Sequence, residues 1–174
     1  MKHGDFLIDI VDEKGAIIGR KKRRDVNKLV DRFHGVYVLM VTESGELVLG
    51  GITERNDLPN IYAHRWGVTS AAIRRSNETA NETAVRTLQR ELLIRDADVK
   101  LLGQGMVTMV DERQLFMSAY YFVSEVPRTY STVDIESLKP MFADQFEEAL
   151  QSNPDRFAPT LQAFWAQYRD KLPI

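Results

Sequence analysis

The feature that most restricts the fold of this chain is an unbroken apolar run rich in β-branched residues, Val36–Val41. A run of this kind is typical of a strand that is covered on both faces. The segment Glu43–Glu46 then turns the chain, and Leu47–Leu49 returns as a partner strand. The sequence therefore predicts a sheet that is buried from both sides at this first strand.

Two further hairpins and one long loop follow from alternation and turn residues. The predicted strands are 6–11 and 16–18 around the turn at 12–15, and 106–110 and 115–123 around the turn at 111–113. The second hairpin is expected to extend the same sheet. Residues 50–66 have no steady period and are predicted to form a surface loop.

Three helices are expected. Thr79–Glu82 has the sequence of a capping box, so the first helix should begin at Ala80. Pro140 suits the first turn of the second helix. The inward stripes are Ala84, Leu88 and Leu92 in the first helix, Phe142, Phe146, Ala149 and Leu150 in the second, and Leu161, Phe164, Trp165 and Tyr168 in the third. The resulting order is strands, one central helix, strands and two helices, which is a mixed α and β domain.

Composition excludes several kinds of protein. The 174 residues suit one domain, and 23 Lys plus Arg against 25 Asp plus Glu give no general attraction to nucleic acid or to an anionic membrane. The absence of cysteine excludes disulfides, thiolate nucleophiles and cysteine-ligated zinc. With no long apolar segment at the N-terminus or later, the chain is expected to be a soluble cytoplasmic protein.

The most informative stretch runs from Trp66 to Ile94 and reads WGVTSAAIRRSNETANETAVRTLQRELLI. It resembles the Nudix box, G-x5-E-x7-R-E-U-x-E-E-x-G-U, where U is aliphatic. The residues that match in register are Glu78, Arg86, Leu88, Glu91 and Ile94. Residues 66–72 are similar to the strand and loop that enter the box in the branch related to isopentenyl diphosphate isomerase. The chain thus resembles the Nudix hydrolase superfamily over nearly its whole length.

This resemblance implies an α+β domain with the Nudix fold, an α/β/α sandwich around a mixed β-sheet. The single domain would span 1–174, with an N-terminal hairpin extension at 1–30 and a degenerate box loop and helix at 66–94. The resemblance also implies hydrolysis of a diphosphate linkage in a nucleotide or related metabolite, Mg²⁺ or Mn²⁺ as cofactor, and a homodimer. The isomerase activity of the branch is disfavoured because its catalytic cysteine is missing.

Several positions depart from the box. The family carries glutamates at i, i+3 and i+4 of the box helix, a spacing that aligns three carboxylates toward a divalent metal. Here these positions are Thr87, Arg90 and Glu91, so two carboxylates are lost and a cation is gained. A fixed Arg90 should oppose metal binding. Ala72 and Leu93 replace the two glycines of the box, which puts the loop and the helix exit in question.

Two functions remain open. In the first, the chain is a Nudix-type pyrophosphohydrolase with Glu91 as catalytic residue and metal ligand, and Glu78 and Arg86 supporting the box loop. In the second, it is a non-catalytic relative that binds a small phosphorylated ligand without metal. The phosphate-binding candidates for this second function are Arg90, Arg74 and Arg75.

Each of these side chains also has an ordinary structural interpretation. Glu91 could be an exposed carboxylate that pairs with Arg95 at i+4, and Arg86 could form a surface pair with Glu82. Arg90 could be a solubilising cation on an exposed face.

The remaining candidates are weaker. The basic run at 20–24 is most often a solvated loop or strand end, with phosphate or nucleic-acid contact as the alternative. Three histidines, His3, His34 and His64, are too scattered to indicate a zinc site. Tyr62 and Trp66 suit either stacking on a ligand or packing in the core.

Overall fold

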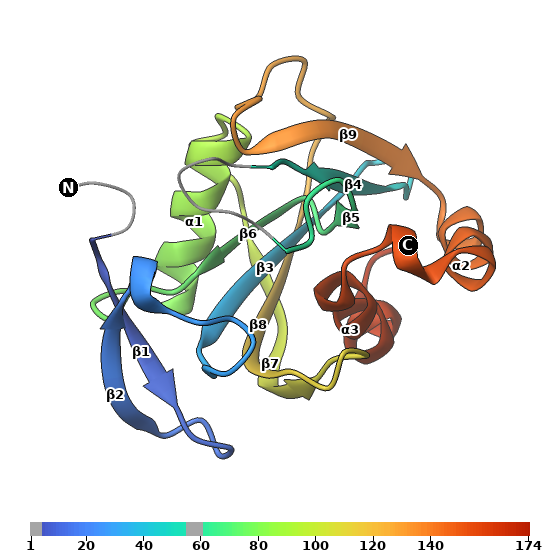
Figure 1. The fold of residues 1–174 in the computed structure, drawn as a ribbon. Helices are drawn as coiled ribbons and strands as arrows, with labels where there is room; N and C mark the ends of the chain where they lie inside the picture. Colours follow the sequence, from blue (N-terminus) through green and yellow to red (C-terminus); the bar gives the residue numbers. More distant parts are fainter. Residues whose placement is uncertain (1–4, 55–60) are drawn as a thin grey trace.

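The protein is represented by a computed structural model that describes residues 5–54 and 61–174. Its strands are β1 (Leu7–Val11), β2 (Ile17–Lys22), β3 (His34–Val41), β4 (Leu47–Ile52), β5 (Trp66–Gly67), β6 (Ser70–Ile73), β7 (Lys100–Thr108), β8 (Gln114–Val123) and β9 (Ile135–Met141). Its α-helices are α1 (Ala80–Glu91), α2 (Ala143–Ser152) and α3 (Pro159–Tyr168), and short 3₁₀ turns are η1 (Arg23–Asp25), η2 (Pro154–Arg156) and η3 (Arg169–Lys171). Figure 1 shows α1 on one side of the main sheet and α3 on the other.

The main sheet has seven strands and is mixed. Its central order is β5-β4-β3-β8-β7, with β6 paired to β3 and β9 paired to β4. Only β3 and β8 run parallel among the described pairs, and the other pairs are antiparallel. This arrangement is the predicted α+β sandwich around a mixed sheet.

Strand β3 is buried on both faces, as the apolar run predicts. One face carries Val36, Val38 and Met40 into a cluster with α1. The opposite face carries Tyr37 and Leu39 into a larger cluster that includes α2 and α3. The strand therefore anchors both layers of the core.

One edge of β3 is shared by two strands that diverge from it. The first half of β3 pairs with β6 through Gly35–Val38, and its end pairs with β4 through Met40 and Val41. Thr69 fills the junction: its hydroxyl accepts a hydrogen bond from the Met40 amide at 2.7 Å and donates to the Val48 carbonyl. Because β4 and β6 separate here, the sheet leaves space beside the first residues of β6.

Helix α1 begins at Ala80, which confirms the capping-box prediction. The Thr79 hydroxyl accepts from the Glu82 amide at 3.1 Å, and the Glu82 carboxylate accepts from the Thr79 amide at 2.8 Å. Caps of this kind typically contribute about 1 kcal/mol. The stripe of Ala84, Leu88 and Leu92 is fully buried, as predicted, so one face of the helix is fixed against the sheet.

The prediction that the second helix begins at Pro140 was wrong. Residues 135–141 form β9, which pairs with β4, and α2 begins only at Ala143. Pro140 is tolerated because β9 is an edge strand, where a missing N–H costs no ladder bond. Phe142, expected to face inward, is 45% exposed, whereas Phe146 is buried. The third helix is confirmed, with Leu161, Phe164, Trp165 and Tyr168 buried.

Three other boundaries differ from the prediction. In the predicted loop at 50–66, residues Gly50–Ile52 belong to β4 instead, and residues 55–60 lie outside the described residues. The second hairpin starts earlier than expected, because β7 begins at Lys100. The strand predicted at 16–18 extends to Lys22 as β2, so Arg20–Lys22 of the basic run form an exposed strand end, which is one of the two ordinary interpretations of that run, and Arg23 begins a 3₁₀ turn.

The N-terminal hairpin β1–β2 forms a separate small sheet (Figure 1). It has its own apolar cluster, which contains Phe6, Ile8, Ile10 and Phe33. In the described ranges, 5–54 and 61–174, no helix has the length and apolar character needed to cross a membrane.

Candidate functional site

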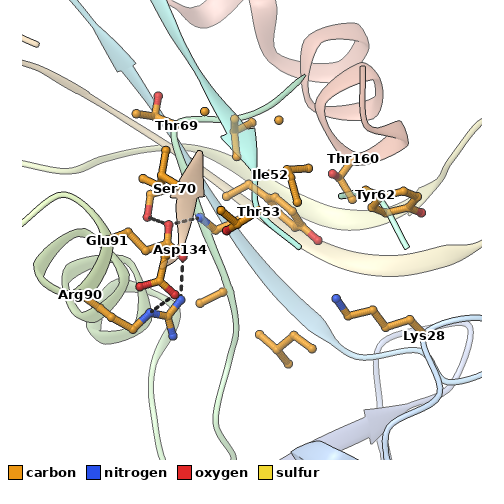
Figure 2. A pocket seen from close by; sticks show the side chains of 18 of the residues that line it. Lys28, Ile52, Thr53, Tyr62, Thr69, Ser70, Arg90, Glu91, Asp134 and Thr160 are labelled. Carbon is orange, nitrogen blue, oxygen red and sulfur yellow. Dashed lines mark hydrogen bonds and ion pairs between the residues drawn. The ribbon is translucent and has the colours of Figure 1, made fainter. Parts of the chain in front are cut away.

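The divergence of β4 and β6 opens into a cavity of about 210 Å³. Its walls come from the end of β4, from β6, from one side of α1, from the chain around η1 and from the β7–β8 turn. Figure 2 shows Arg90 and Glu91 of α1 on one side of this pocket and Lys28 on the other. The box helix thus faces a pocket, as the resemblance implies.

Glu91 is buried at this wall and hydrogen-bonded by β6. The Ser70 hydroxyl donates to its Oε2 at 2.6 Å, and the Ala71 amide lies at 3.4 Å from the same oxygen. Burial raises the pKa of the Glu91 carboxyl, and the opposing effects of Arg90 and Ser70 are smaller. The interpretation of Glu91 as an exposed partner of Arg95 is therefore wrong.

Arg90 is paired with two carboxylates at the pocket wall. Its Nη2 donates to Glu91 Oε1 at 2.7 Å, and its Nε lies 3.8 Å from Asp134 Oδ1. The Arg90 side chain is 30% exposed and lines the cavity. It is thus a component of the site, and the interpretation of Arg90 as a solubilising surface cation is wrong.

Thr87, at the first of the three glutamate positions, is buried and used inside the protein. Its hydroxyl lies 3.0 Å from the Ser70 hydroxyl and donates to the Ala71 carbonyl at 3.2 Å. Helix α1 and strand β6 are therefore joined by hydroxyls at a place where the family helix offers carboxylates.

Glu78 and Arg86 form a partly buried pair at the start of the box. Arg86 donates to both carboxylate oxygens of Glu78, from Nε at 2.7 Å and from Nη2 at 2.9 Å. Its Nη2 also reaches the Ile73 carbonyl at 3.3 Å, and the Thr83 hydroxyl donates to Glu78 at 2.9 Å. Burial tends to raise the pKa of Glu78, but the hydrogen bonds from Arg86 and Thr83 leave it below its usual value.

This pair ties the loop after β6 to α1, which is the geometry that the loop-supporting role requires. The alternative surface pair between Arg86 and Glu82 is not what the structure has, because Glu82 closes the capping box instead.

The opposite wall carries cations and an aromatic ring. Lys28 and Arg113 line the cavity, and Arg113 Nη1 donates to the Lys28 carbonyl at 2.8 Å. The Arg113 guanidinium lies over the Tyr62 ring at 4.9 Å, and the Tyr62 hydroxyl donates to Asp111 at 2.8 Å. Tyr62 is thus part of the pocket wall, whereas the half-buried Trp66 packs against the core with Lys139 over its ring at 5.5 Å.

Arg74 and Arg75, predicted to bind phosphate, lie outside the lining of this cavity. Arg74 Nη2 is 3.7 Å from Asp9, and Arg75 lies over the Phe6 ring at 4.4 Å with its Nη1 3.8 Å from Glu78. The structure therefore brings Arg90 and Glu91 together at the pocket and directs the other two arginines toward the N-terminal hairpin and the box loop.

His34 and His64 lie in different parts of the described structure. The His34 ring centroid lies 4.6 Å from that of Phe116, with the two rings tilted by 33°. His64 lies on the surface between Glu54 and Glu136, with ring nitrogens 3.3 and 3.1 Å from their oxygens. His3 lies outside the described residues.

The glycine replacements have different consequences. Leu93 sits just past the end of α1 with a φ of 59°, the left-handed conformation that the family glycine favours, so the helix exit is kept at a cost of about 1–2 kcal/mol. Ala72 lies inside β6, paired with Val36, and is not among the residues with positive φ. No left-handed backbone is needed there.

The donor set on the box helix does not fit a divalent metal. It consists of a guanidinium, a hydroxyl that is hydrogen-bonded to β6, and a buried carboxylate that is already bonded to Arg90 and Ser70. In the part of the chain that the structure describes, three or more His, Asp or Glu side chains are nowhere grouped as a metal site.

Four site residues were missed by sequence reasoning: Ser70, Asp134, Lys28 and Arg113. All four lie on elements other than α1 and come to the pocket through the fold. Ser70 lies inside the segment 66–72 that was recognised as the box entry, which was the one available signal. The other three residues have none.

Comparison with known proteins supports this interpretation of the fold. No family model matches the chain. An uncharacterised Nudix hydrolase of Pseudomonas aeruginosa is 25% identical over 154 residues, covering 86% of this chain and 88% of that protein. Among solved structures, DR0079 of Deinococcus radiodurans has a TM-score of 0.71 at 17% identity, with 84% of this chain and 89% of that chain covered. The MutT protein of Methanosarcina mazei has a TM-score of 0.59 at 18% identity, with 79% and 93% covered.

A third structure is the Nudix domain of Shewanella oneidensis NrtR in complex with ADP ribose. It has a TM-score of 0.56 at 12% identity, with 80% of this chain and 88% of that chain covered. These similarities, with the topology around α1, show that the chain has the Nudix fold.

Proposed function

We propose that this chain binds a small phosphorylated ligand in the pocket beside α1, without a metal ion on the box helix. The observation that carries the proposal is the Arg90 guanidinium, which is paired with Glu91 and Asp134 at the pocket wall. A guanidinium has five N–H donors. Among the described residues only Glu91 accepts a hydrogen bond from the Arg90 side chain, so donors remain for a phosphate.

The charges of the pocket support an anionic ligand. The cations that line it are Arg23, Lys28, Arg86, Arg90 and Arg113, and the lining acids are Glu91 and Asp134. Both acids are within ion-pair distance of Arg90. Arg86 and Arg113 are paired with Glu78 and Asp111, which lie outside the lining, so the surplus of positive charge comes from the other lining cations. Such a surplus attracts anions and repels divalent metal. One unit charge at about 4 Å interacts with another by about 4 kcal/mol at an effective dielectric near 20, and with a divalent ion by about twice that.

The class of ligand comes from the structural neighbours. The Shewanella oneidensis NrtR domain is a complex with ADP ribose, and a bifunctional NMN adenylyltransferase/ADP ribose pyrophosphatase of Francisella tularensis is a complex with AMP and manganese. Nucleotide-like phosphates are therefore the first ligands to test on this chain.

The test is calorimetric titration of AMP and ADP-ribose into the protein in EDTA. We expect saturable binding that Arg90→Met weakens by about 10- to 100-fold, because a charge-assisted hydrogen bond to the phosphate is lost. Arg95→Met, at an exposed arginine near the end of the same helix, should bind as the unaltered protein does. Binding that is absent in EDTA and appears with Mn²⁺ would overturn the proposal.

The second candidate is a Nudix-type pyrophosphohydrolase with Glu91 as catalytic residue and metal ligand. It is favoured by the position of Glu91 and Asp134 at one pocket wall and by the relative that is named a Nudix hydrolase. Its test is the formation of AMP and ribose 5-phosphate from ADP-ribose with Mg²⁺ or Mn²⁺, which Glu91→Gln should abolish.

The more specific parts of the resemblance belong to the same proposal. The branch related to isopentenyl diphosphate isomerase is kept as a sequence relationship only, and isomerase activity is not proposed because the chain has no cysteine. A homodimer and a cytoplasmic location are likewise proposals that rest on the resemblance.

A further inference from the structure

Lys28 is a cation of the pocket to which the proposed function assigns no specific contact with the ligand. It follows η1 and lines the cavity on the side opposite Arg90, as Figure 2 shows. Its backbone carbonyl is held by Arg113, but its ammonium makes no hydrogen bond or ion pair with any residue in the described ranges. A partly buried ammonium without a partner is costly, so its presence in a pocket calls for an anion.

The charged groups around Lys28 are either cations or an acid that is already bonded to other residues. Burial, followed by the charges of Arg23 and Arg113, lowers the pKa of Lys28 to about 8. The nearby acid Asp111 is bonded by the Arg113 guanidinium at 2.8 Å and by the Tyr62 hydroxyl at 2.8 Å.

Tyr37, on β3, is the other titratable group of this wall, and burial raises its pKa far above the usual value, so it stays neutral. Lys28 is therefore the group of this wall whose charge changes near neutral pH.

The space between the two walls is small. Ile52, Thr53 and Tyr62 also line the cavity, with Tyr62 on the side of Lys28 in Figure 2. The cavity of about 210 Å³ is smaller than the roughly 300–1,000 Å³ of sites that enclose drug-sized ligands. A ligand that reaches both walls and stays inside must be compact.

We propose that the pocket takes a compact ligand with two anionic groups, such as a monosaccharide bearing a phosphate at each end. Arg90 on α1 binds one phosphate, and Lys28, supported by Arg113, binds the other. This inference rests on the proposed function and adds the class of its ligand.

The test compares fructose 1,6-bisphosphate with fructose 6-phosphate by calorimetry in EDTA. The bisphosphate should bind about 10- to 100-fold more tightly at about pH 7, because it adds a charge-assisted contact. Lys28→Met should remove this advantage, while Lys14→Met, at an exposed lysine of the β1–β2 turn, should keep it. Between about pH 7 and pH 9 the affinity for the bisphosphate should fall about tenfold as Lys28 loses its proton.

The Lys28→Arg variant keeps the positive charge at position 28 and tests whether the pH dependence comes from the titration of Lys28. It should keep the preference for the bisphosphate and abolish the pH dependence, because a guanidinium does not titrate in this range; a pH profile unchanged in this variant would contradict the inference even if Lys28→Met failed to fold. If the monophosphate and AMP bind and the second phosphate adds nothing, the inference is wrong and the proposed function stands. If no phosphorylated probe binds, both are wrong.

Discussion

Replacement of Arg90 with methionine is expected to lower the free energy of unfolding by about 3 kcal/mol at neutral pH. The variant removes the cation that pairs with Glu91 at 2.7 Å and lies 3.8 Å from Asp134, and leaves a buried carboxylate hydrogen-bonded only by β6. Urea unfolding of both proteins at several pH values measures the effect.

The loss of unfolding free energy in Arg90→Met should depend on pH. Burial raises the pKa of Glu91 above 4.5 in the folded protein, so the folded state favours the protonated carboxyl, and the contribution of Glu91 to stability falls as pH rises through the folded pKa. Without Arg90 this pKa rises further. The difference between the two proteins should therefore be small near the unfolded pKa and grow toward neutral pH.

The matched control is Arg95→Met, which removes an exposed arginine near the end of the same helix and should change stability by less than about 0.5 kcal/mol. A loss in Arg90→Met that equals the loss in the control, or that is independent of pH, would show that Arg90 does not hold these carboxylates.

Replacement of Glu78 with glutamine should cost about 3 kcal/mol at neutral pH. The Glu78 and Arg86 side chains are only 14% and 19% exposed, and the substitution leaves the Arg86 guanidinium without its two charged hydrogen bonds. Because the pKa of Glu78 is lowered on folding, its contribution is present above the unfolded pKa near 4.5 and is lost as pH falls through the folded pKa. Thermal unfolding at neutral and at acid pH measures both effects.

Glu148→Gln, at an exposed carboxylate of α2, is the control for the loss of one negative charge. If Glu78→Gln and Glu148→Gln unfold alike at neutral pH, the pair between Glu78 and Arg86 does not support the box loop.

Local sequence patterns predicted the elements that are determined by residues close together in the chain. The apolar run at 36–41 became β3, buried on both faces, and Thr79–Glu82 capped α1 at the expected residue. The register of the box also assigned Glu78 and Arg86 to the box loop, where the structure pairs them. Each of these depends on residues that are close together in the chain.

Strand β9 could not be predicted in this way. Its sequence, IESLKPM, has no regular alternation of polar and apolar residues, and the strand is held by pairing with β4 at the edge of the sheet. Considered only with its neighbours in the sequence, Pro140 predicts the start of a helix. The position of β9 at the edge of the sheet explains why proline is accepted in a strand there.

The residues that contact Arg90 and Glu91 in the pocket also could not be predicted from the sequence. The box spacing placed Arg90 and Glu91 on one helix, but their contacts come from Ser70 on β6 and Asp134 before β9. Lys28 and Arg113 meet only because the chain around η1 packs on the β7–β8 turn. A linear motif carries no information about such contacts between elements.

The measurement that tests the central claim most directly is a titration of Mn²⁺ into the protein and into Glu91→Gln, each with and without AMP. If Arg90 has replaced the metal on the box helix, no saturable binding of Mn²⁺ depends on Glu91, and AMP binds equally well with EDTA and with Mn²⁺. Saturable Mn²⁺ binding that Glu91→Gln weakens, together with AMP binding that requires Mn²⁺, would contradict this account and identify the pocket as a metal-dependent Nudix site.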